Sequence, residues 1–296
     1  MDVTALNRLI ASAGCFSGAE AAGWSIDPAI LAPFLLSGLL YAAGVVRLWR
    51  AAGFGRGATF RQAGCFAAGW LLLGAALVSP LHELSVELFS AHMVEHELVM
   101  AAAAPLLVLA RPLGPMLWAF PARSRRAVAR SAKLLAYLCG WDVLSRPLVA
   151  TILHAVAIWA WHVPPAFEAA LLHEPLHWLQ HLSFLVTALF FWWAMFETRR
   201  QGAAVIDLFF TAMHTAFLGV LLTVAPRPMY PLQSALSAHF GLDPLADQQL
   251  AGLIMWVPAG TVYVGAGLAL AWHWISRSSR QQAPLFSGEG HARRAG

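Results

Sequence analysis

Charged residues are scarce in this sequence. Asp, Glu, Lys and Arg make up 11% of its 296 residues, whereas hydrophobic residues make up 59%. A soluble domain usually carries about 25% charged residues, because water has to solvate its surface. Water cannot solvate a fold this poor in charge, but lipid can. The composition therefore indicates an integral membrane protein.

Cysteines and catalytic motifs are also few. The three cysteines, Cys15, Cys65 and Cys139, do not have the spacing of a metal-binding or redox motif, which excludes a disulfide framework. The sequence shows no nucleophile–base pair, and the glycines of segment 53–57 lack the strand and helix that flank a nucleotide-binding loop. We therefore expect no enzymatic activity.

Long apolar segments make up most of the chain. A helix needs about 20 apolar residues to cross a hydrocarbon core about 30 Å thick. We predict an all-α, polytopic membrane helix bundle with an outer N-terminal segment (1–27), a transmembrane domain (28–276) and a disordered cytoplasmic tail (277–296). A search for apolar windows gives seven candidate spans, at 29–49, 60–79, 86–110, 147–163, 177–196, 204–225 and 250–275.

The basic residues predict the orientation of these spans. All Lys and Arg residues except Arg8 and Arg227 lie in the loops after spans 1, 3 and 5 or after span 7. Basic loops stay in the cytoplasm, which predicts an outer N-terminus and a cytoplasmic C-terminus. This distribution explains the net charge of +4 without a nucleic-acid partner. The basic stretch 111–146 is expected to contact anionic headgroups of the lipid bilayer.

Histidine is common for a membrane chain, with twelve residues. Ionisable side chains inside a bilayer are costly and tend to mark function. His92 and His96 on span 3 are four residues apart, so they share one helical face, which Met100 continues one turn deeper. Two imidazoles and a thioether suit copper, and the thioether favours Cu(I). Met93 stands where a zinc protease motif needs Glu, which excludes that hydrolase.

Other spans bring further histidines to the same depth. Span 5 repeats the four-residue spacing in His177 and His181, and span 4 ends at the outer surface in His162. This matched depth favours a shared metal or haem site if spans 3, 4 and 5 pack together, and a structural polar network is the alternative. Including two deeper histidines on spans 4 and 6, the candidate metal ligands are His92, His96, His162, His177, His181, Met100, His154 and His214.

Five motifs together resemble the CtaG family of cytochrome c oxidase assembly factors. They lie at 92–96, 161–164, 177–181, 226–230 and 247–258. The resemblance implies a seven-span protein of the bacterial cytoplasmic (inner) membrane that acts in respiratory-chain assembly, namely of caa-type haem–copper oxidase. The partners it implies are oxidase subunits and a copper chaperone. The histidines it carries over are His92, His96, His162, His177 and His181.

Two positions depart from the pattern expected of that family. Gln is expected where Glu95 stands, and an acidic residue where Gln180 stands. If these side chains orient the neighbouring histidines, the affinity of the site and the tautomers of its imidazoles will differ in this chain.

Three hypotheses fit these residues. The first is a carrier that delivers copper to the oxidase during its assembly. The second is a haem-binding protein, because histidines on facing helices can ligate haem axially. The third is a copper permease, which needs ligands along the whole bilayer. The inner half of the bundle offers mainly Cys65 and His273, and this asymmetry favours an outward-facing site.

Overall fold

The computed structural model describes residues 23–24, 27–198 and 201–286, and the side chains of all of these except 239 and 278–286. Every regular element within these ranges is a helix. Most of the predicted outer segment, with Cys15, and residues 287–296 of the predicted tail lie outside the described ranges. The last helix continues to Phe286, past the predicted end of the transmembrane domain at residue 276.

Within the described residues, six helical segments are long and apolar enough to cross a membrane, and there are seven if a bent pair of helices counts as one span. The all-α polytopic bundle is therefore confirmed, while the orientation of its termini stays a prediction. The six segments are α2 (Pro28–Ala52), α3 (Phe60–Leu77), the run of α5 (Phe89–Glu97), η1 (Leu98–Ala103) and α6 (Ala104–Ala110), α12 (Glu174–Glu197), α13 (Gln201–Val224) and α15 (Pro244–Phe286).

The fourth predicted span is the bent pair. Helix α10 (Pro147–His162) ends where Val163 takes an extended conformation, and α11 (Pro164–Leu172) departs at 75°. A residue that precedes proline avoids the helical conformation, because the proline ring clashes with it. Pro164 therefore ends the span at His162 and turns the chain across the end of the bundle.

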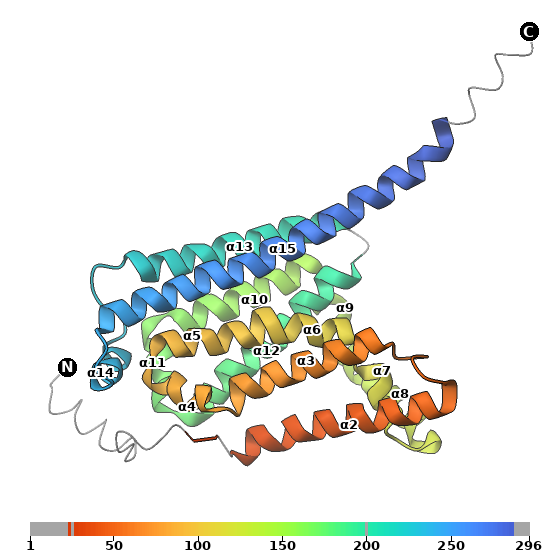
Figure 1. Ribbon diagram of the computed structural model, residues 1–296, viewed down its shortest axis with the longest axis horizontal. Helices are drawn as coiled ribbons and strands as arrows, with labels where there is room; N and C mark the ends of the chain where they lie inside the picture. Colours follow the sequence, from red (N-terminus) through yellow and green to blue (C-terminus); the bar gives the residue numbers. More distant parts are fainter. Residues whose placement is uncertain (1–22, 25–26, 199–200, 287–296) are drawn as a thin grey trace, which may run out of the picture.

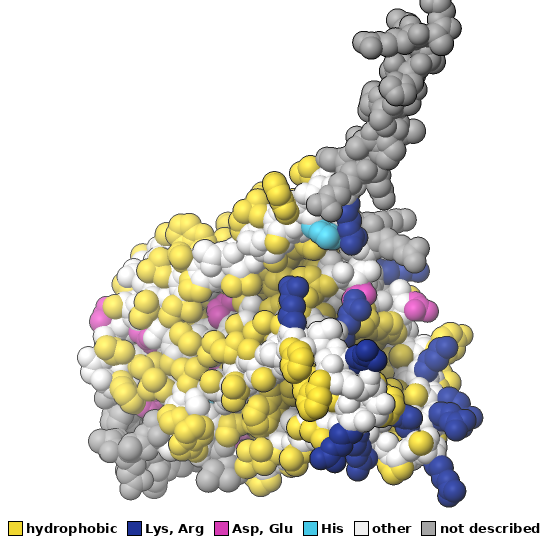
Figure 2. Space-filling model, turned by 45° about the vertical axis from the view of Figure 1, so that its right-hand side comes forward, with side chains coloured by type: hydrophobic (Ala, Val, Ile, Leu, Met, Phe, Trp, Pro, Cys, Tyr) yellow, Lys and Arg dark blue, Asp and Glu magenta, His cyan; other side chains and the backbone are white. Residues whose placement is uncertain are grey.

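Short helices divide between the two ends of the bundle (Figure 1). Helices α4 (Pro80–Glu87), α11 and α14 (Pro231–His239) lie at one end, and α7 (Leu113–Leu117), α8 (Ala122–Leu138) and α9 (Trp141–Leu144) at the other. Lys and Arg side chains gather at one end of the molecule, while most of the visible side is hydrophobic (Figure 2). Helix α8 carries five basic residues, and none of its residues is buried. By the predicted orientation, α8 lies at the cytoplasmic end.

The third span lies at the centre of the bundle. In its most apolar stretch 61% of the residues are buried, against 17% in α2 and in α3. Its middle is the π-helical turn η1, where Trp192 of α12 donates a hydrogen bond from Nε1 to the carbonyl of Met100 (2.9 Å). Such π-helical turns occur frequently at functional sites. The central position of this span surrounds the polar side chains of α5 with protein rather than lipid.

Candidate metal centre

Two histidines of α5 form the centre of the site. His92 and His96 are one helical turn apart, and their ring centroids are 4.2 Å from each other. Their exposed fractions are 0% and 1%. The i, i+4 spacing thus places both imidazoles on the buried face of α5, as the sequence predicts.

The second pair, His177 and His181, lies on the first turns of α12. The two Nε2 atoms are 3.0 Å apart, and Pro175 lies in the first turn of this helix, where a missing N–H costs nothing. The pairs face each other across the bundle, because His96 lies 5.3 Å from His181 and His92 lies 5.8 Å from His177, measured between ring centroids. The predicted packing of spans 3 and 5 around a shared site is therefore present.

His162 completes the set from the last turn of α10. Its ring centroid is 6.2 Å from that of His96. Its Nδ1–H donates to the carbonyl of Ile158 (2.6 Å), and its own carbonyl accepts a hydrogen bond from the hydroxyl of Tyr230 (2.8 Å). The end of α10 and the chain that leads into α14 are thereby fixed beside the site.

Several imidazole nitrogens in this cluster are free to bind a ligand. The Nδ1–H of His92 donates to the carbonyl of Ser85 (3.1 Å), as that of His162 does to Ile158. Each bond fixes the tautomer in which Nε2 carries the lone pair. Among the described side chains, Nε2 of His92, Nε2 of His162 and both ring nitrogens of His96 are buried without a hydrogen-bond partner. Buried polar atoms normally find a partner, so this group of unpaired nitrogens indicates a binding site.

Two residues that the sequence argument did not place in the site also contact it. Oε1 of Glu95 accepts a hydrogen bond from Nδ1 of His82 (2.7 Å) and lies 3.7 Å from Nε2 of His181. Burial alone would lower the pKa of His82, but the hydrogen bond to Glu95 and its charge outweigh burial and raise that pKa. Glu95 therefore lies in the cluster rather than on another face of α5. Its i+3 spacing from His92 was the available signal, because residues three apart are also neighbours on a helix.

The remaining predicted ligands are Met100, His154 and His214. Met100 is part of the hydrophobic core, within the π-helical turn that starts after Glu97 and shifts the helical register. His154 lies about 12 Å from His162 along α10, given a rise of about 1.5 Å per residue. It contacts Thr187 and Tyr263 through its two ring nitrogens, and His214 accepts a hydrogen bond from Trp159. His154 and His214 therefore make their hydrogen bonds outside the cluster.

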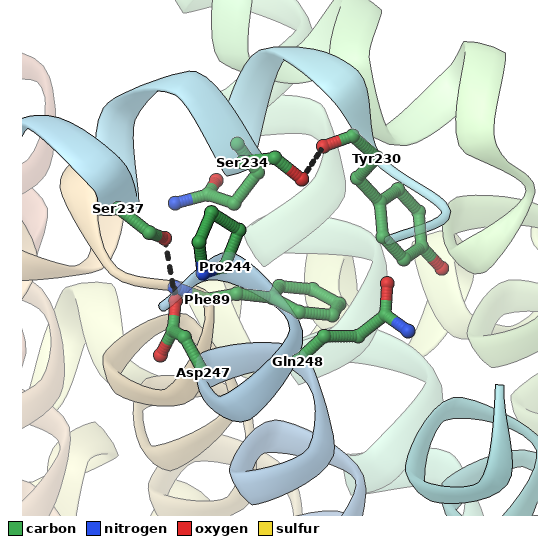
Figure 3. A pocket seen from close by; sticks show the side chains of 8 residues that line it. Phe89, Tyr230, Ser234, Ser237, Pro244, Asp247 and Gln248 are labelled. Carbon is green, nitrogen blue, oxygen red and sulfur yellow. Dashed lines mark hydrogen bonds between the residues drawn. The ribbon is translucent and has the colours of Figure 1, made fainter. Parts of the chain in front are cut away.

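A buried carboxylate holds the start of α5 in place. Asp247 of α15 accepts hydrogen bonds from the backbone N–H groups of Phe89 (2.8 Å) and Ser90 (3.1 Å) and from the hydroxyl groups of Ser90 (2.5 Å) and Ser237 (2.6 Å). Leu88, at the N-cap of α5, has no side-chain oxygen to do this. Figure 3 shows Asp247 and Ser237 in a small pocket beside Phe89 and Tyr230. The first turn of α5, which carries His92, is thus anchored by a residue from a distant part of the chain.

Comparison with known proteins identifies the family. A family model described as "Cytochrome c oxidase caa3 assembly factor" matches residues 39–277. The chain belongs to this family. The matched range contains every histidine of the cluster and Glu95, so the resemblance seen in the motifs is confirmed.

One curated relative is similar to this chain and has no described function. This caa3 assembly factor family member is 28% identical over 280 residues to an uncharacterized protein of Mycobacterium leprae (strain TN), an alignment that covers 87% of this chain. The chain spans 40% of the length of that relative. No solved structure matches the chain significantly.

Proposed function

We propose that this protein binds copper in the histidine cluster of α5, α10 and α12 and delivers it during assembly of a caa3-type haem–copper oxidase in the bacterial cytoplasmic membrane. The observation that carries the proposal is the convergence of unpaired, buried imidazole nitrogens of His92, His96 and His162. Neutral imidazole is a good ligand for copper. Membership of the assembly factor family supplies the client.

The packing around the cluster favours an ion over a haem group. The imidazoles contact one another, and the rings of Phe167 and Phe184 lie 4.9 Å from His92 and 4.6 Å from His96 between centroids. A porphyrin would have to separate these rings, whereas a single ion needs far less room. The position of the cluster at the end of the bundle that carries α4, α11 and α14 also favours a carrier over a permease, which needs ligands along the whole membrane.

Copper content tests the proposal directly. Detergent-purified protein is expected to hold stoichiometric copper, and the His92→Ala/His96→Ala variant is expected to lose it, because three of the unpaired imidazole nitrogens of the cluster are removed. His214→Ala is the matched control, since it removes a buried histidine that contacts Trp159 instead of the cluster. Copper, zinc and haem are measured by mass spectrometry and absorption. Copper that is retained in the double variant, or a haem spectrum in its place, would contradict the proposal.

A cellular experiment tests the client. Deleting the gene is expected to lower caa3 oxidase activity and the copper content of the isolated oxidase, because the copper would no longer be delivered. Wild-type protein and His214→Ala should restore both, and His92→Ala/His96→Ala should restore neither although it is present in the membrane at the same level. An oxidase with normal copper in the deletion strain would exclude the delivery role.

A further inference from the structure

The part of the cluster that is closest to the surface has a different set of donor atoms. One oxygen of Glu95 and one ring nitrogen each of His82 and His181 lie within 4.8 Å of one another. The deeper position, formed by His92, His96 and His162, offers imidazole nitrogens alone. His82 comes from α4, an element that contributes nothing to the deeper position except the Ser85 carbonyl that orients His92.

We infer that the cluster contains a second metal position, formed by His82, Glu95 and His181, which binds a divalent transition-metal cation such as Zn(II) or Cu(II). Two imidazoles and one carboxylate are a donor set used by divalent ions in proteins. The inference extends the proposed function, because it gives the same histidine cluster a second position with its own metal preference.

A simple ion pair does not account for these residues. Glu95 is completely buried, and only Oε1 is hydrogen-bonded, to His82. Its other oxygen, Oε2, is buried without a partner, and so is Nδ1 of His181. A buried, unpaired carboxylate oxygen is costly. A cation held between the three side chains would give the carboxylate a full positive partner.

Exposure separates the two positions. His82 and His181 are 9% and 8% exposed, whereas His92 and His96 are 0% and 1% exposed. The two imidazoles of the carboxylate position therefore lie nearer the surface, at the rim of the cluster, than His92 and His96, while Glu95 itself is fully buried. A cation that enters from this end reaches Glu95 and His82 before it reaches His96.

The charges around the rim favour cation entry. The carboxylates of Glu83 and Asp27 are close enough to act electrostatically on His82. In the described part of the chain, Arg227 is the only Lys or Arg at the end of the bundle where α4, α11 and α14 lie. Clefts lined by charge of one sign raise the local concentration of the opposite ion. Outside the cluster, the other described carboxylates of this end are Glu87, Glu168, Glu174, Asp243 and the buried Asp247.

Separate titrations with Zn(II) alone and with Cu(I) alone test the two positions. Full-length wild-type protein in detergent is compared with Glu95→Gln, which keeps the size of the side chain and removes its charge. Glu95→Gln is expected to weaken Zn(II) binding by tenfold or more and to leave Cu(I) binding within about twofold. His96→Ala should do the opposite. Glu97→Gln is the matched control, because it neutralises a glutamate two residues away on the same helix, and it should change neither.

The outcomes distinguish this inference from the proposed function. Zn(II) that binds Glu95→Gln as tightly as wild type would overturn the second position. Zn(II) binding that depends on Glu95, in a protein that binds no Cu(I), would support the second position and reject copper delivery. If Glu95→Gln fails to fold, X-ray absorption of the Zn(II)-loaded wild type decides. Mixed nitrogen and oxygen ligation with a carboxylate supports the inference, and ligation by nitrogen alone overturns it.

Discussion

An Asp247→Ala variant is expected to lose about 3 kcal/mol or more of stability, because each buried donor that is left unpaired costs about 1–3 kcal/mol, and to bind copper more weakly. Asp247 is 4% exposed and accepts four hydrogen bonds, two of them from the first backbone N–H groups of α5. A carboxylate at a helix N-terminus also interacts favourably with the helix dipole. Alanine would leave these donors buried and unpaired, and the turn that carries His92 would lose its anchor.

Thermal unfolding and copper titration of the purified variant measure both effects. Asp243→Ala is the matched control, since this exposed aspartate accepts a hydrogen bond from the backbone of Ala246 near the start of the same helix. Loss of such a local cap costs about 1 kcal/mol. Asp247→Asn should fall between the two, because an amide keeps one acceptor oxygen. Equal unfolding temperatures for Asp247→Ala and Asp243→Ala would contradict the anchoring role.

The number of spans could be predicted from the sequence because a membrane imposes a length on every apolar helix. The seven predicted spans correspond to the six spanning segments and the bent pair α10–α11. Pro164 and Pro165 mark where span 4 ends, but the 75° bend depends on what α11 packs against. Phe167 of α11, for example, lies 5.1 Å from Phe89 and 4.8 Å from Tyr230 between ring centroids. Such contacts between distant segments have no signature in local sequence.

The candidate site was predictable to the extent that it depends on helical spacing. Each of the pairs His92–His96 and His177–His181 follows from the i, i+4 rule, and the pairs meet because α5 and α12 pack together. His82 could not be found this way, since a single histidine outside the predicted spans has no spacing to interpret. Met100 shows where the spacing rule does not apply. The regular spacing that linked it to His96 is interrupted by a π-helical turn, which depends on tertiary packing such as the Trp192 hydrogen bond.

The packing of α13 against α15 leads to the second prediction. These helices lie side by side along most of the bundle (Figure 1), and their backbones meet at Gly219 and Gly252. A Cβ atom at Gly219 would be 2.6 Å from the carbonyl oxygen of Gly252, and one at Gly252 would be 2.8 Å from the backbone nitrogen of Thr223. Small residues allow such close approach between membrane helices. The obstructing atoms are backbone, so they cannot move aside as a flexible side chain would.

Gly252→Ala is therefore expected to destabilise the protein by about 3 kcal/mol, at the upper end of the cost of overpacking, although alanine is the better helix former. Gly265→Ala is the matched control on the same helix, because a Cβ atom there meets nothing within 4 Å. It should be neutral or stabilise the protein by up to about 1 kcal/mol, the difference in helix propensity.

Gly252 is little more than one turn after Asp247, so moving α15 outward also withdraws the cap from α5. Copper binding should then weaken in Gly252→Ala and stay unchanged in Gly265→Ala. Unfolding temperatures that shift equally in the two variants would show that the contact between α13 and α15 does not set the position of Asp247.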